Sequence, residues 1–197
     1  MARDRVGVFG GSFDPVHVGH LAIAQAALDT VPLDRVVFVP ARRSPLRDEG
    51  PIASEADRLA MLQAATKDEA RFAVSRAELD RPSPSYTVDT LEALASEGRL
   101  YLILGSDAVA ELDRWRDVRR ILELATLLVA ARPGAPELPT GRPVDLLDAP
   151  CLDISSRELR ARAARGRSLR YLVPDAVWRY IERSGLYRAE ADPSPAT

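Results

Sequence analysis

Short apolar runs that alternate with helical patterns constrain the fold of this chain more than any other feature. The runs RVGVF, RVVFV and LYLIL are rich in β-branched and aliphatic residues, and each ends at a glycine or a proline, as buried strands do. Amphipathic stretches lie between them. This alternation predicts βαβ units and therefore an α/β fold: a single doubly wound, Rossmann-like parallel sheet with helices on both faces and a small C-terminal helical segment.

The expected elements follow one another along the whole chain. We expect strands at residues 5–9, 35–39, 72–74, 100–104 and 127–131, and helices at 18–28, 55–66, 87–97, 107–112, 117–124, 155–164 and 174–183. Ser54, with Asp57 three residues later, is a typical N-cap for the second helix. We expect a surface loop at 133–143, one domain over 1–187 and a disordered tail over 188–197.

Composition excludes several classes of protein. The chain has 197 residues, of which 46 % are hydrophobic, enough for one sizeable core. A formal net charge of −2 argues against a nucleic-acid partner. No apolar run has membrane-spanning length and the N-terminal run is too short for a signal peptide, so we expect a cytoplasmic protein without a membrane partner. The single cysteine, Cys151, excludes an intramolecular disulfide and a cysteine-built metal site. A homo-oligomer is compatible with the sequence.

Glycine or proline follows three of the expected strands, at the end where a parallel sheet binds its ligands. Gly10 and Gly11 follow the first strand, residues 40–50 follow the second, and Gly105 follows the strand at 100–104. Ligands of doubly wound sheets bind beyond the carboxyl ends of the strands, where the strand order reverses. We therefore expect these three segments to open onto one crevice.

Both histidines of the chain lie in the stretch GGSFDPVHVGH, residues 10–20. Glycines after a strand let the backbone approach a phosphate, and the N-terminus of the following helix attracts anions. His17 and His20 are about one helical turn apart, so we expect them to point the same way, as protonated donors to phosphate oxygens. Gly19 between them would leave a flat spot for a base.

The residues alone are also compatible with a metal site or with a histidine pair that has no role. The stretch matches neither the P-loop pattern nor G-x-G-x-x-G, so sites of those two kinds lose support. Two histidines could bind a metal, but the chain has no third histidine and no usable cysteine to complete the site. The pair could also lie on a helix face without any role. A nucleotide phosphate site is the functional hypothesis that the residues favour.

Residues 10–20 resemble the GxFxPxHxGH signature of the nucleotidyltransferase superfamily. The rest of the chain is similar to the bacterial nicotinate mononucleotide adenylyltransferases in stretches such as VFVPARRSP, PSYTVDTLEAL, LILGSDAVAELDRW and ISSRELR. Together the matching stretches cover nearly all of residues 5–187. The resemblance implies an enzyme that binds ATP and nicotinate mononucleotide and forms the dinucleotide and pyrophosphate, with Mg²⁺ accompanying ATP.

The resemblance also implies which residues contact ATP. His17 and His20 would bind the triphosphate, and Ser156 and Arg160 would meet its β- and γ-phosphates; these four form the expected catalytic set. Further expected ATP contacts are Gly10, Gly11, Ser12, Phe13, Gly19, Arg47, Gly105, Asp107, Arg132 and Ser155. One of the two serines could instead be only a helix N-cap. No metal ligand is expected.

For the second substrate, the resemblance places three residues at the mononucleotide. Tyr86 and Thr87 would bind the nicotinate carboxylate through backbone N–H groups at a helix start, and Trp115 would stack on the pyridine ring. Trp115 could instead be a core residue. The sequence departs from the family at Arg47, which stands where relatives often carry a lysine.

Four alternatives to this function remain: two are adenylyltransferases, one is another class of enzyme, and one is not an enzyme. Phosphopantetheine adenylyltransferases share the histidine motif but typically lack a segment like PSYTVDTL. An adenylyltransferase that prefers nicotinamide mononucleotide differs only in the second substrate. Class I aminoacyl-tRNA synthetases carry a motif similar to HVGH, but they are far longer and need a KMSKS-like loop that this chain lacks. A nucleotide sensor would bind ATP without turnover, and the presence of the whole expected catalytic set argues against it.

Overall fold

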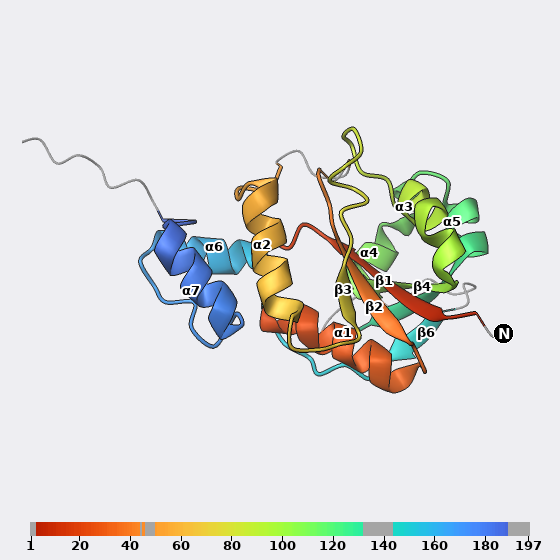
Figure 1. Ribbon diagram of the computed structural model, residues 1–197, viewed down its shortest axis with the longest axis horizontal. Coiled ribbons are helices and arrows are strands. Elements are labelled where there is room, and N and C mark those ends of the chain that lie inside the picture. Colours follow the sequence, from red (N-terminus) through yellow and green to blue (C-terminus); the bar gives the residue numbers. More distant parts are fainter. Residues whose placement is uncertain (1–2, 44, 46–49, 132–143, 189–197) are drawn as a thin grey trace, which may run out of the picture.

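A six-stranded parallel sheet runs through the protein (Figure 1). The computed structural model describes residues 3–43, 45, 50–131 and 144–188. The strands are β1 (Arg5–Gly11), β2 (Arg35–Pro40), β3 (Phe72–Val74), β4 (Arg99–Gly105), β5 (Ala125–Ala130) and β6 (Val144–Leu147). Their order is β3-β2-β1-β4-β5-β6, and neighbouring strands are parallel throughout. This is the doubly wound order that the sequence predicts.

Helices cover both faces of the sheet. They are α1 (Val18–Thr30), α2 (Glu55–Thr66), α3 (Thr87–Leu94), α4 (Ser106–Ala110), α5 (Val118–Leu124), α6 (Ser156–Ala164) and α7 (Asp175–Ser184), with 3₁₀ turns η1 (Ala95–Glu97) and η2 (Leu112–Arg114). One core cluster joins the sheet to α1, α2, α6 and α7, and a second joins it to α3, α4 and α5. Figure 1 shows α6 and α7 beside α2, at the opposite end of the molecule from α3 and α5.

The two core clusters follow from the alternation of side chains along each strand. In β2, Val36 and Phe38 belong to the cluster with α1, whereas Val37 and Val39 belong to the cluster with α3. All four are buried, which explains why RVVFV is a continuous apolar run. Burial on both faces is what a parallel sheet between two helical layers requires.

The strand order reverses between β1 and β4, and the predicted ligand-binding segments meet there. Gly11, the last residue of β1, pairs with Pro40 of β2, and β1 also pairs with β4, which ends at Gly105. The loop after β2 holds the segment before α3: the main-chain N–H of Ser85 donates to the carbonyl of Arg43 at 2.9 Å. The three segments thus lie at one edge of the sheet, as predicted.

Most predicted elements are confirmed, and the differences have physical reasons. The sequence carries no signal for β6, because it is a four-residue edge strand of which two residues are exposed. The helix expected at 87–97 ends at Leu94 and continues as the 3₁₀ turn η1. The expected loop at 133–143 and, apart from Arg188, the expected tail lie outside the described residues. Among the described helices, none combines the length and apolar character that crossing a bilayer requires.

Candidate active site

The two histidines stack at the start of α1. His17 is the N-cap residue and is 3 % exposed, while His20 lies in the first turn and is half-buried. Their ring centroids are 3.7 Å apart and the ring planes differ by 30°. The Phe13 ring packs edge-on against His20, with 5.0 Å between the ring centroids. The prediction that both imidazoles point the same way is confirmed.

A hydrogen bond between the histidines indicates the charge state of His20. The main-chain N–H of His17 donates to Nδ1 of His20 at 3.2 Å. A ring nitrogen that accepts a hydrogen bond carries no proton, so this contact selects the neutral ring with its proton on Nε2. Two positively charged rings stacked at this distance would also repel each other. The structure therefore favours a neutral donor at His20 over the protonated pair that the sequence suggested.

Two glycines on either side of the loop, Gly11 at the end of β1 and Gly19 at the start of α1, make room for neighbouring rings. A Cβ on Gly11 would lie 3.1 Å from the ring of Phe13, which is fully buried and adopts a left-handed backbone conformation with φ of 46°. A Cβ on Gly19 would lie 3.0 Å from Nδ1 of His17. Gly19 is itself buried, so it does not form the flat surface expected for a base. Its structural role is to admit the His17 ring. By contrast, Gly10 is exposed with open space around it.

Helix α6 docks onto the loop before the histidines. The Ser156 hydroxyl donates to the carbonyl of Pro15 at 2.9 Å, and Nη1 of Arg160 donates to the carbonyl of Asp14 at 2.7 Å. Ser155 is the N-cap, because its Oγ accepts the main-chain N–H of Glu158 at 3.2 Å. The structure thus brings the four residues of the expected catalytic set to one loop, although Ser156 and Arg160 are more than a hundred positions from it.

The residues expected at the mononucleotide also come together. Tyr86 is the N-cap of α3, and Thr87 is its first residue. The guanidinium of Arg116 lies 4.7 Å from the centroid of the Tyr86 ring and 3.6 Å from the carboxylate of Asp89. These contacts place the segment that carries Trp115 beside the start of α3. Trp115 is half-buried and packs against the core, so part of its side chain stays accessible, and its stacking on the pyridine ring stays a prediction.

Four other expected ATP contacts have different outcomes. Gly105 is the N-cap of α4, and Asp107 is exposed in the first turn of that helix. Both lie at the sheet edge that carries the histidine loop. Arg47 and Arg132 lie outside the described residues. Within the described ranges, no three His, Cys, Asp or Glu side chains cluster closely enough to hold a metal ion.

Comparison with known proteins decides the family. Residues 8–162 match the family described as cytidylyltransferase-like. The chain belongs to this family. The match spans all four residues of the expected catalytic set as well as Tyr86, Thr87 and Trp115. The resemblance stated from the sequence is therefore confirmed, while the roles of single residues stay predictions.

Relatives of this cytidylyltransferase-like chain carry one recurring name, probable nicotinate-nucleotide adenylyltransferase. The protein of that name from Roseiflexus castenholzii is 53 % identical over 201 residues, which cover 95 % of this chain and 100 % of the relative. The one from Thermus thermophilus is 48 % identical over 187 residues, with 93 % and 100 % covered. The solved nicotinic acid mononucleotide adenylyltransferase of Plasmodium falciparum, complexed with NaAD, shares the fold. Its TM-score is 0.78 at 18 % identity, with 94 % of this chain and 98 % of that chain covered.

A buried carboxylate that the sequence did not reveal organises the histidine loop. Asp14 is 1 % exposed. Its carboxylate accepts hydrogen bonds from the main-chain N–H groups of Ile52 and Ala53, at 2.8 and 3.1 Å, and from the Tyr187 hydroxyl at 2.7 Å. Arg160 lies 3.6 Å from the same carboxylate. The available signal in the sequence was a carboxylate directly before Pro15, the one acidic residue of the stretch at 10–20.

A buried arginine on α2 holds the same loop. Arg58 is 1 % exposed, and its Nη1 donates to the carbonyl of Ser12 at 2.7 Å. Burial lowers the pKa of the guanidinium, and the Asp14 carboxylate acts in the opposite direction. Three carbonyls of the loop, those of Ser12, Asp14 and Pro15, thus accept hydrogen bonds from side chains of α2 or α6. These hydrogen bonds tie the loop to both helices.

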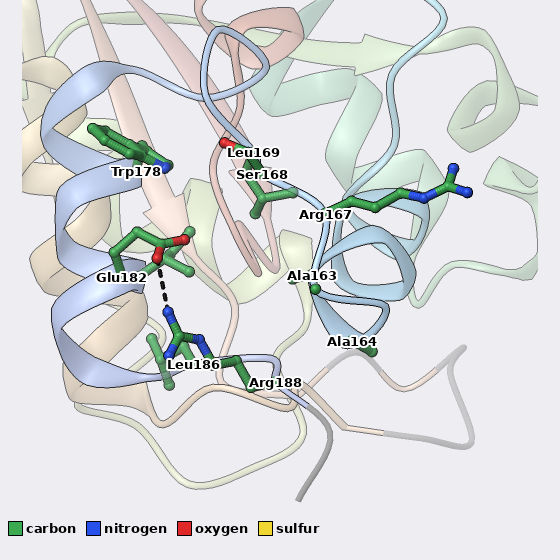
Figure 2. A pocket seen from close by; sticks show the side chains of 11 residues that line it. Ala163, Ala164, Arg167, Ser168, Leu169, Trp178, Glu182, Leu186 and Arg188 are labelled. Carbon is green, nitrogen blue, oxygen red and sulfur yellow. Dashed lines mark hydrogen bonds and ion pairs between the residues drawn. The ribbon is translucent and has the colours of Figure 1, made fainter. Parts of the chain in front are cut away.

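A cavity of about 410 Å³ lies between α6 and α7, away from this site (Figure 2). Its lining includes Ala163, Arg167, Trp178 and Glu182. None of the described residues that we expect at the active site lines it. The histidine loop, and not this cavity, is therefore the candidate active site.

Proposed function

We propose that this chain transfers AMP from ATP to nicotinate mononucleotide and forms nicotinate adenine dinucleotide and pyrophosphate. The observation that carries the proposal is the docking of Ser156 and Arg160 on the loop that leads to His17 and His20. This arrangement gathers a cation, a hydroxyl and two imidazoles at one edge of the sheet. The names of the similar curated proteins support the same reaction.

The reaction requires alignment of reactants and compensation of charge, and no covalent enzyme intermediate. An oxygen of the mononucleotide 5′-phosphate forms a bond to the α-phosphorus of ATP, and the bond from that phosphorus to the bridging oxygen breaks. The electron pair leaves with pyrophosphate, so negative charge grows on the leaving group. His20 would donate Nε2–H to it, and Arg160 would supply a positive charge held by the carbonyl of Asp14.

Mg²⁺ would enter with ATP. Since the described residues form no cluster of three metal-binding side chains, phosphate oxygens and water would hold the ion. When bound, Mg²⁺ neutralises phosphate charge. The side chains of Arg160 and His20 would add donors in fixed positions, which is the contribution that alignment demands.

The acid form of the mononucleotide suits the start of α3. The free N–H groups at this helix end favour an anion, and Arg116 adds a positive charge over the ring of Tyr86. The carbonyl of a neutral nicotinamide group could accept hydrogen bonds from these N–H groups, but without a negative charge it would gain less from the helix end and from Arg116. Trp115 offers a flat surface beside this helix end for the pyridine ring.

Release of pyrophosphate tests the proposal. The purified chain is incubated with ATP, Mg²⁺ and either nicotinate or nicotinamide mononucleotide, and pyrophosphate is measured over time. We expect release with both nucleotides and a higher kcat/KM with the acid. Release with neither mononucleotide, together with normal ATP binding, would indicate a nucleotide sensor instead.

A further inference from the structure

A buried hydrogen bond joins the C-terminal end of the described chain to the loop of the active site. The Tyr187 hydroxyl donates to Oδ1 of Asp14 at 2.7 Å, across 173 positions of sequence. Tyr187 is 8 % exposed and Asp14 is 1 % exposed, so water does not compete for this bond. None of the steps proposed above uses Tyr187.

Asp14 connects Tyr187 with Arg160. One carboxylate oxygen, Oδ1, accepts from Tyr187 and from the main-chain N–H of Ala53, while Oδ2 lies 3.6 Å from Nη1 of Arg160. That same Nη1 donates to the main-chain carbonyl of Asp14 at 2.7 Å. The guanidinium is therefore held by a neutral carbonyl at hydrogen-bond distance and by the carboxylate at a longer distance.

We propose that Tyr187 is a positioning residue for Arg160. Its hydroxyl holds the Asp14 carboxylate by Oδ1 and takes up part of the negative charge there. Without this donor the N–H groups of Ile52 and Ala53 still hold the carboxylate, but more of its negative charge remains uncompensated. The guanidinium of Arg160 then forms a closer ion pair with Asp14 at the expense of the phosphates. The inference rests on the proposed function, in which Arg160 meets the leaving pyrophosphate.

The backbone around Tyr187 is built to hold this hydroxyl in place. Tyr187 adopts a left-handed conformation with φ of 63°, which is uncommon for a bulky residue. Leu186 before it packs against the core, and Arg188 after it pairs with Glu182 of α7 at 2.7 Å (Figure 2). The neighbours on both sides thus anchor the chain to α7 and the core, while Tyr187 reaches the loop.

The chain offers a matched control. The Tyr180 hydroxyl donates to Oδ1 of Asp57 at 2.8 Å, a second bond from a tyrosine in the C-terminal part of the chain to a carboxylate. Asp57 interacts with Ser54 and Tyr180 at the start of α2, whereas Asp14 interacts with Arg160. Tyr180→Phe therefore removes the same chemical group without affecting the Asp14 junction.

Steady-state kinetics of Tyr187→Phe and Tyr180→Phe, measured well below their unfolding temperatures, test the proposal. We expect kcat of Tyr187→Phe to fall about 10- to 100-fold, because a misplaced charged group costs that much. KM for ATP should rise by no more than about tenfold, because Arg160 also meets the phosphates of bound ATP, whereas KM for nicotinate mononucleotide should change by less than about threefold. Tyr180→Phe should keep the wild-type kcat. Equal kcat values for the two variants would overturn the proposal.

A double-mutant cycle separates positioning from general destabilisation. In the Arg160→Ala background, Tyr187→Phe should cause no further loss of kcat, because the group that it positions is absent. An undiminished further loss would overturn the proposal. If Tyr187→Phe fails to fold, Tyr187→His, whose ring can donate a hydrogen bond, is compared with Tyr187→Met, which has no donor. Tyr187→His should retain the higher kcat, and this difference should vanish in the Arg160→Ala background; equal kcat values for the two variants would overturn the proposal.

Calorimetry of pyrophosphate binding tests the role of Tyr187 without requiring the proposed reaction to occur. We expect Tyr187→Phe to weaken pyrophosphate binding about tenfold, and only when Arg160 is present. This result would support the junction even if the wild type released no pyrophosphate with nicotinate mononucleotide, an outcome that would count against the proposed reaction alone. Unchanged pyrophosphate affinity in Tyr187→Phe would contradict the positioning role.

Discussion

His17 donates its main-chain N–H to Nδ1 of His20, and the two rings stack with 3.7 Å between their centroids. The helix start therefore fixes which nitrogen of His20 carries the proton. Nε2–H becomes a donor of set direction, supported by the ring of Phe13. A donor that is already oriented needs little reorganisation when charge develops on a leaving group.

His20→Ala removes this donor. We expect kcat to fall about 100- to 1000-fold, because loss of one oriented donor to a developing charge has that effect. His20→Gln, whose amide can also donate, should retain part of the activity. Pyrophosphate release gives kcat, and circular dichroism checks the fold. Near-normal turnover of a folded His20→Ala variant would contradict the role of this residue.

Gly19→Ala tests whether the His17 ring must occupy its present place. The added Cβ would lie 3.0 Å from Nδ1 of His17, so the ring has to shift slightly from its place beside His20. We expect kcat to fall about tenfold with only a small change in unfolding temperature. Unchanged kcat would show that the stacked arrangement is not needed for turnover.

Gly98→Ala should lower stability and leave catalysis unchanged, the reverse of what we expect for Gly19→Ala. Gly98 is far from the histidines in sequence and directly precedes β4, at the opposite end of that strand from Gly105. Gly98 has φ of 157°, and a Cβ there would overlap the carbonyl oxygen of Asp4. We expect a loss of about 2 kcal/mol or more in the free energy of unfolding, measured by denaturant titration. The KM values should stay at their wild-type level below the unfolding transition. A Gly98→Ala protein as stable as the wild type would contradict this account of the glycine.

Trp115→Ala removes the flat surface beside α3. We expect KM for the mononucleotide to rise about tenfold or more, since stacking on an aromatic ring contributes that much to the binding of a base. KM for ATP should stay near the wild-type value, and Trp115→Phe should recover most of the loss. A rise in KM for ATP alone would contradict the placement of Trp115 at the mononucleotide.

Asp57 makes the stability of the protein depend on pH. Hydrogen bonds from the hydroxyls of Ser54 and Tyr180 lower the pKa of Asp57 below its unfolded value of 3.8. A lowered pKa means that the stabilisation is present above the unfolded pKa and is lost as the pH falls through the folded one. We expect Asp57→Asn to weaken the loss of stability between about pH 5 and pH 2, measured by thermal unfolding. An identical acid profile in the variant would contradict this.

The sequence predicted the parts of the site that lie in continuous motifs. The glycine-ended run RVGVF and the stretch GGSFDPVHVGH placed the histidine pair at the end of the first strand, and the structure confirms that placement. It also confirms Ser54 as an N-cap, because capping depends on residues only a few positions apart, and it shows that Ser155, of the two serines the sequence left open, caps α6.

The parts that the sequence did not reveal depend on long-range packing. Tyr187 meets Asp14 across 173 positions, and no local pattern marks either residue as a partner of the other. Arg58 lies on the same buried face of α2 as Met61 and Leu62, where an arginine is unusual, and its guanidinium donates to the carbonyl of Ser12. The protonated histidine pair was the natural expectation near phosphate, and only the contact with Nδ1 of His20 favours the neutral ring.

A crystal structure with a non-hydrolysable ATP analogue and nicotinate mononucleotide tests the central claim most directly. We predict that the β- and γ-phosphates lie between Nε2 of His20 and the guanidinium of Arg160, with the nicotinate carboxylate at the start of α3. Phosphates bound in the cavity between α6 and α7, with both histidines turned to solvent, would contradict the account.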